Sequence, residues 1–217
     1  WSDLLRIDQA SLTPEGAVAA SRWVRKQFVE NRPYDVWARE ILTVQGGALA
    51  ESPAPIYKAL NEPEVLSRAV SQLFLGVRIE CAQCHHHPFE RWSQDDYFGL
   101  AGFFTGMSRK TIPNQGEVLL SRGGTDLKHP RTGVVIPARA LGAPAADFKL
   151  VTDRRVALAN WMTAPDNRFF APAIVNRMWA HYFGRGLVEP VDDLRDTNPP
   201  TNAPLFDALV QHMKDVK

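Results

Sequence analysis

The densest group of residues able to do chemistry is the stretch Cys81-Ala82-Gln83-Cys84-His85, which two further histidines follow. The chain holds only two cysteines. A disulfide across so short a loop would remove little entropy from the unfolded chain. Two thiols that are two residues apart and followed by histidine fit covalent attachment of haem c, in which the imidazole is the proximal iron ligand. The motif therefore predicts haem c on Cys81 and Cys84, with His85 as an iron ligand.

Other uses of the two thiols remain open. Both thiolates with one or two of the histidines 85–87 would suit zinc or non-haem iron, because soft thiolates and imidazoles bind both metals. A site made of cysteines alone would need a second pair, which the chain lacks. A thioredoxin-like redox pair favours a βαβ context, which the pattern around Cys81 does not indicate. The structural alternative is a reduced, buried pair of thiols beside a surface cluster of histidines.

Helical patterns surround this motif. Apolar residues from Leu66 to Val77 recur at helical spacing and lead directly into Cys81, and Ser93 with Asp96 resembles a capping box that opens the next helix. Thr13-Pro14 is typical of a helix start. Asp153 is expected to cap another helix. Further helices are predicted over about 14–30, 34–43, 171–183 and 205–213, and Gly46-Gly47 is assigned to a loop.

Residues 106–150 differ from the rest, because Gly, Pro and Thr interrupt short β-branched runs at 117–120 and 133–136. They predict a loose hairpin and long loops. The fold class expected is mainly α: a helical haem-binding module with long loops and a small β-hairpin insertion. Three parts are predicted, namely a helical domain with the CxxCH motif at 1–110, an irregular or β-hairpin connection at 111–150, and a helical companion segment at 151–217.

Composition narrows the class of protein. Hydrophobic residues make up 45% and charged residues 23% of the 217 residues, which excludes a wholly disordered chain. The formal charge of +1 argues against a dedicated nucleic-acid binder. No apolar run approaches the roughly 20 residues that cross a bilayer. A first residue other than Met and an end inside a helical pattern indicate a piece of a longer protein.

The second axial ligand of the iron is predicted to be His181. It lies among aromatic residues in Trp179-Ala180-His181-Tyr182-Phe183, and Arg177 and Arg185 could pair with the haem propionates. A core histidine bonded to a backbone carbonyl remains an alternative. The other candidates for this ligand are Met107, Met162, Met178, Met213, His87, His129 and His212, among which Met162 and Met213 are expected to fill the core.

Asp192, Asp193 and Arg195 form a compact charged group. A pair of carboxylates can perform acid–base catalysis or bind a cation. We favour a structural role, in which such a turn holds a helix cap and a salt bridge. The chain shows no local signature of a Ser/His/Asp nucleophile and no Walker or Rossmann glycine loop.

The residues around the cysteines resemble a known family, the planctomycete cytochrome c-associated domain of unknown function. The matching residues are Phe74-Leu75-Gly76-Val77-Arg78, Cys81-Ala82-Gln83-Cys84-His85, His87-Pro88-Phe89, Trp92, Gln94-Asp95-Asp96-Tyr97 and Phe103-Phe104. A later stretch resembles its companion, a planctomycete-specific domain of unknown function, through Arg155, Leu158, Ala159, Trp161, residues 174–181, Phe183-Gly184-Arg185-Gly186 and Pro190-Val191-Asp192-Asp193. At Thr201-Asn202 the chain departs from the family, which often has Ser-His there.

This resemblance implies the C-terminal part of the first domain joined to the N-terminal part of the second. It also implies a large exported protein, periplasmic or at the cell surface, that often begins with a separate cytochrome c-like domain. The family supplies no established reaction.

The function that the sequence favours is a c-type haem-binding electron-transfer module of a larger exported protein. Its partners would be a redox protein or other haem domains of the same polypeptide, and no nucleic acid is expected. The alternative is a haem- or metal-dependent enzyme that acts on an extracellular substrate, so whether the chain is an enzyme stays open. A structural interaction domain with an incidental thiol pair is a third hypothesis.

Overall fold

The fold is mixed α/β, as seen in a computed structural model that describes residues 1–8, 10–47, 51–113 and 116–216. In these ranges the chain is 44% helical, with eight α-helices, and 10% strand, with two small sheets. The expected mainly α fold is therefore wrong. The helices pack on one another through a hydrophobic core, and no haem-binding helical module is shown within the described ranges.

The first half of the chain contains five α-helices, and their starts follow local sequence rules. Thr13 caps α1, because its Oγ1 accepts a hydrogen bond of 3.1 Å from Gly16 N–H, and Pro14 fills the first helical position. Ser93 and Asp96 form the predicted capping box of α5. The helices are α1 (Pro14–Val29), α2 (Tyr34–Thr43), α3 (Ile56–Ala59), α4 (Pro63–Val70) and α5 (Gln94–Ala101).

The helix before the cysteines ends earlier than its apolar pattern predicts. Helix α4 continues as a π-helical turn over Ser71–Leu75, which Gly76 terminates in the left-handed conformation with φ 65°. Glycine adopts this conformation without the steric cost of a Cβ. The Ser71 hydroxyl donates to the Val77 carbonyl at 2.7 Å and fixes the exit of the chain. The segment from Val77 onward is therefore a connection to the cysteine motif and not part of the helix.

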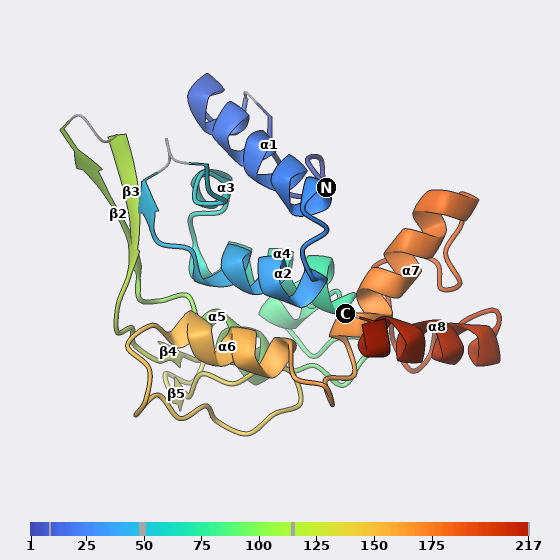
Figure 1. Ribbon diagram of the computed structural model, residues 1–217. Coiled ribbons are helices and arrows are strands. Elements are labelled where there is room, and N and C mark those ends of the chain that lie inside the picture. Colours follow the sequence, from blue (N-terminus) through green and yellow to red (C-terminus); the bar gives the residue numbers. More distant parts are fainter. Residues whose placement is uncertain (9, 48–50, 114–115, 217) are drawn as a thin grey trace.

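Three helices follow in the last third of the chain: α6 (Arg154–Met162), α7 (Phe170–Phe183) and α8 (Ala203–Val216). Asp153 caps α6 as predicted, since its carboxylate accepts from Arg155 N–H at 3.0 Å. Gly184 ends α7 with a left-handed φ of 76°. Figure 1 shows α7 and α8 on one side of the molecule and a β-hairpin on the other.

The strands differ from the sequence prediction in their pairing. Strand β2 (Met107–Ile112) forms an antiparallel hairpin with β3 (Gly116–Ser121), and β1 (Gly46–Gly47), predicted as a loop, pairs with the other edge of β3. Strand β4 (Leu127–Lys128) pairs separately with β5 (Val135–Ile136). The β-branched runs at 117–120 and 133–136 thus lie in different sheets. Strand β2 was not predicted because its central residues are polar and exposed, which leaves no alternation to detect.

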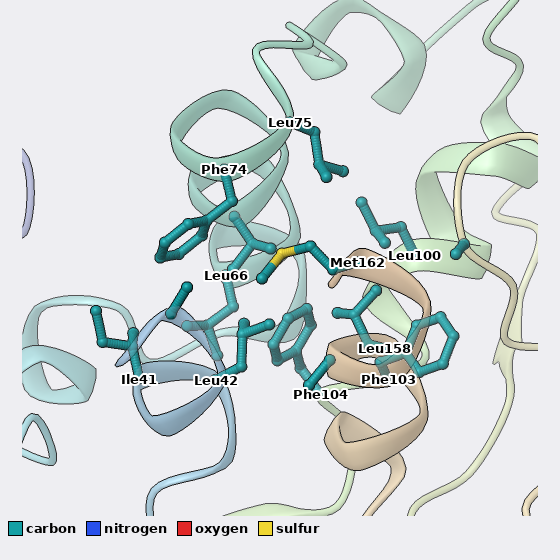
Figure 2. Packing of buried hydrophobic residues seen from close by; sticks show 14 of the residues in the cluster. Ile41, Leu42, Leu66, Phe74, Leu75, Leu100, Phe103, Phe104, Leu158 and Met162 are labelled. Carbon is teal, nitrogen blue, oxygen red and sulfur yellow. The ribbon is translucent and has the colours of Figure 1, made fainter. Parts of the chain in front are cut away.

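The core joins elements from both ends of the chain. Figure 2 shows side chains from α2, from α4, from α6 and from the segment that follows α5. They meet around Met162, which is fully buried. Each large apolar side chain buried in this way contributes about 1.5–3 kcal/mol. The labelled members are Ile41, Leu42, Leu66, Phe74, Leu75, Leu100, Phe103, Phe104, Leu158 and Met162. Met162 therefore fills the core, as predicted, and is not available as an iron ligand.

Candidate functional site

The two cysteines lie on a single exposed turn. Residues Glu80–Gln83 form a short 3-10 helix, and Cys81 and Cys84 are both exposed and free of disulfide bonds. Ala82 is fully buried between them and anchors the turn to the core, with its N–H donating to the Ile79 carbonyl at 3.0 Å. The N–H groups of Cys84 and His85 both donate to the Cys81 carbonyl at 3.3 Å. The structure therefore holds both thiols and the first histidine on one turn, and it rules out a buried thiol pair.

Side chains from other parts of the chain hold this turn in place by hydrogen bonds. The buried Gln94, in the first turn of α5, donates from Nε2 to the Gln83 carbonyl at 2.9 Å. Arg68 of α4 donates to the Gln83 side-chain oxygen at 3.0 Å, and Arg131 donates to the Gln94 side-chain oxygen at 3.1 Å. Sequence reasoning did not assign a role to Gln94. Gln94 does belong to Gln94-Asp95-Asp96-Tyr97, one of the stretches that resemble the family, and this could have indicated that the residue matters.

His85 is held with one ring nitrogen occupied. Its Nδ1 lies 2.6 Å from the His86 carbonyl oxygen. A carbonyl can only accept a hydrogen bond, so Nδ1 carries the proton and the lone pair of the neutral ring is on Nε2. An imidazole whose Nδ1–H is bonded to a backbone carbonyl is oriented to bind a metal through Nε2. The exposed His85 ring is thus prepared to act as a ligand.

His87 has the opposite hydrogen-bond arrangement. Its Nδ1 accepts from the Phe89 N–H at 3.3 Å, while its backbone N–H donates to the Trp92 carbonyl at 2.9 Å. The neutral ring therefore carries its proton on Nε2 and stabilises the loop over 87–92. Burial, and next the charge of Arg195, lower the pKa of His87. His87 is consequently a loop residue and not a prepared ligand.

We expect an NMR titration of the His87 ring to give a midpoint below the ordinary value of 6.5, because desolvation and Arg195 disfavour the charged ring. The folded pKa lies below the unfolded one, so His87 opposes folding only as the pH falls below about 6.5. Arg195→Gln should move the midpoint upward. A wild-type midpoint above 6.5 would contradict this arrangement.

The remaining predicted site residues lie on α7 or directly after it. Arg177 donates from Nη2 to the Gln72 carbonyl at 3.4 Å, and His181 and Arg185 are exposed. Within the described ranges no hydrogen bond or ion pair connects these three residues with the turn over 80–85. The structure brings together Cys81, Cys84 and His85. The assignments of His181, Arg177 and Arg185 stay predictions.

Aromatic residues near His181 do line a groove. It has a volume of about 510 Å³ and lies between the end of α1, α7 and α8. Trp179, Tyr182 and Phe183 form part of its wall, together with Met178, His212 and Met213. His181 itself is not part of this lining. Of the other histidine candidates, His129 accepts hydrogen bonds at Nδ1 from Arg131 and Thr132 N–H and closes a turn.

The salt bridge predicted for the charged group at residues 192–195 is present. Arg195 pairs with Asp193 at 3.2 Å, and Asp192 pairs with Arg78. Burial would raise the pKa of Asp192, but hydrogen bonds from Gln72 and Arg78 and the charge of Arg78 outweigh it and lower the pKa. No group of three or more His, Cys, Asp or Glu side chains able to hold a metal ion is found in the part of the chain that the structure describes.

Two family models match the chain. The model PSCyt2, a protein of unknown function (DUF1549), covers residues 1–109, and the model PSD1, a protein of unknown function (DUF1553), covers residues 154–217. The resemblance that the sequence suggests is confirmed, including the order of the two domains. Neither a curated protein nor a solved structure gives a significant match.

None of the described helices is long and apolar enough to span a membrane. The first match ends after the cysteine turn, and the second begins at α6. Buried residues of both matched regions belong to the same hydrophobic core. The chain therefore belongs to the PSCyt2 family of planctomycete cytochrome c-associated domains of unknown function, with a PSD1 region following it.

Proposed function

We propose that the Cys81–His85 turn carries a covalently attached haem c and that the chain acts as an electron-transfer module of a larger exported protein. The observation that carries the proposal is the combination of two free, exposed thiols with a histidine whose Nε2 is left unprotonated on the same turn. This donor set matches the two thioether links and one imidazole ligand of haem c.

Both thiols are in the state that attachment requires. Each sulfur adds to one vinyl carbon of the haem and the thiol hydrogen goes to the other carbon, so the addition consumes no oxidant or reductant. It does require reduced and accessible cysteines, and both conditions agree with the free, exposed thiols. Bound haem would supply an iron that cycles between two oxidation states one electron apart.

The exposure of the turn suits transfer of electrons between proteins. Phe89, four residues beyond His85, is 65% exposed and lies on the same loop as His87. A haem attached here would remain close to the surface, where a redox partner or another haem domain of the same polypeptide can approach. In this proposal His181 would supply a second ligand to the iron, and Arg177 and Arg185 would pair with the haem propionates.

An exported location follows from the proposed cofactor, because haem c is attached outside the cytoplasm. The alternative of a zinc or non-haem iron enzyme has less support, because the described residues form no group of three or more His, Cys, Asp or Glu side chains that could hold a metal ion. No observation favours a particular extracellular substrate.

The test is expression of the chain with export and the haem attachment machinery, followed by haem staining on a denaturing gel. We expect staining that survives acid-acetone extraction, and sharp α and β bands after reduction. The Cys81→Ala/Cys84→Ala variant should lose the stain while keeping its helical circular dichroism. A folded, colourless wild-type protein that contains stoichiometric zinc would contradict the proposal.

A further inference from the structure

A segment of the PSD1 region packs against the chain that enters the cysteine turn. The Asp192 carboxylate accepts hydrogen bonds from the Gln72 side chain and from Arg78 Nε, the latter at 2.9 Å. The Leu194 N–H donates to the Gly76 carbonyl at 2.8 Å. These contacts join residues more than a hundred positions apart in the sequence. They fix the chain at Gln72 in the π-helical turn and at Gly76 and Arg78 between this turn and Cys81.

The approach of Leu194 depends on glycine at position 76. A Cβ on Gly76 would lie 2.7 Å from Leu194 Cδ1, and the left-handed φ of 65° disfavours any side chain there. The Leu194 side chain therefore covers the backbone at the point where the helix ends. If residues 192–195 move, the chain between Gly76 and Cys81 loses contacts that hold it in place.

The same segment also contacts the chain after the turn. The Arg195 guanidinium lies 5.3 Å from the centre of the Phe89 ring, within the range of a cation–π contact, and Asp193 holds the guanidinium by an ion pair of 3.2 Å. Phe89 N–H in turn donates to the His87 ring. The segment over 192–195 thus contacts the chain on both sides of the Cys81–His85 turn.

Helix α7 holds this segment in place. Asn176 is fully buried and donates from Nδ2 to the carbonyls of Val188 at 2.8 Å and Val191 at 3.0 Å. Asn198 donates to the carbonyls of Glu189 and Asp193, both at 3.0 Å. The segment over 192–195 is therefore part of a fixed loop of the PSD1 region and not a mobile strap.

We infer that residues 192–195 are a latch by which the PSD1 region holds the cysteine turn of the PSCyt2 region, with Asp192 as a positioning residue for haem attachment at that turn. The inference rests on the proposed function for its haem part. The contacts themselves concern only the haem-free chain, so they can be tested separately.

Hydrogen exchange of the haem-free protein tests the latch directly. In Asp192→Asn we expect the N–H groups of Ala82, Cys84 and His85 to exchange about fivefold faster or more, as the loss of one net hydrogen bond predicts. The matched control is Asp207→Asn, which removes an exposed carboxylate on α8. Unchanged exchange at these three amides, or equal acceleration throughout α1, would overturn the inference.

A charge swap distinguishes the latch from a general loss of structure. Arg78→Asp alone should accelerate the same amides, and Arg78→Asp combined with Asp192→Arg should return them to within about twofold of the wild type. Failure of the swap together with unchanged exchange in the Arg78 variant would count against the latch.

Haem loading of the exported protein separates the two proposals. We expect Asp192→Asn to lower the fraction of chains that carry covalent haem, while Asp207→Asn leaves it unchanged. A wild type without haem would refute the proposed function while the exchange experiment still decides the latch. Full loading of Asp192→Asn would refute the role of Asp192 in attachment.

Discussion

Replacing Asp153 by alanine is expected to lower the free energy of unfolding by about 3–5 kcal/mol, because it leaves a buried arginine without its counter-ion. Asp153 is 4% exposed and Arg155 fully buried. The carboxylate accepts from Arg155 Nη2 at 2.8 Å and from the Ser121 hydroxyl at 2.9 Å. Arg155 Nη2 also donates to the Val44 carbonyl at 3.0 Å. One substitution therefore weakens contacts among α6, β3 and the end of α2.

Arg155 stays charged with or without Asp153, because a guanidinium is not deprotonated in proteins. Burial alone would lower the pKa of Arg155, but Asp153 and Tyr57 outweigh it and raise the pKa above its already high ordinary value. The stabilisation contributed by this raised pKa would be lost only when the pH rises through the pKa of Arg155. The decrease in the free energy of unfolding caused by Asp153→Ala should therefore be the same from about pH 5 to 9.

Urea denaturation measures the effect, and a neighbouring pair supplies the control. Asp126 pairs with Arg154 at 2.7 Å, but both side chains are partly exposed. Asp126→Ala should therefore cost only about 1 kcal/mol or less. Equal losses in the two variants would show that burial of the Asp153–Arg155 pair does not determine its energy.

The helices could be predicted because their signals are local. Thr13-Pro14, the Ser93–Asp96 capping box and Gly184 each act within one helical turn, and the structure confirms all three. The sheets depend on partners distant in sequence. Gly46 pairs with Leu119 through the backbone alone, so no side-chain pattern indicates the pairing.

The candidate site divides in the same way. Its cysteines and first histidine are adjacent in sequence and could be identified from their spacing. The proton position of His85 depends on a carbonyl contact, and the role of Asp192 depends on Gln72 and Arg78, more than a hundred residues away. The sequence therefore predicts the salt bridge within residues 192–195, but it does not predict that Gln72 and Arg78 bind Asp192.

The contrast between His85 and His87 leads to the second large effect. In haem-loaded protein we expect His85→Ala to lose the imidazole ligand of the iron completely and His87→Ala to keep it. The reason is that Nε2 of His85 is unprotonated, whereas the Phe89 N–H occupies Nδ1 of His87 and the proton lies on its Nε2. The two substitutions remove the same ring from positions only two residues apart, so each is the control for the other.

Optical and paramagnetic resonance spectra measure the outcome. His85→Ala should retain covalent haem, because Cys81 and Cys84 remain, but its spectrum should change to that of an iron that has lost an axial ligand. Free imidazole added to the solution should restore the wild-type spectrum, since it can occupy the vacated position. His87→Ala should need no such addition. If instead His87→Ala required imidazole and His85→Ala did not, the proton positions derived from the hydrogen bonds would be wrong, and the loop over 87–92 would have to rearrange when haem binds.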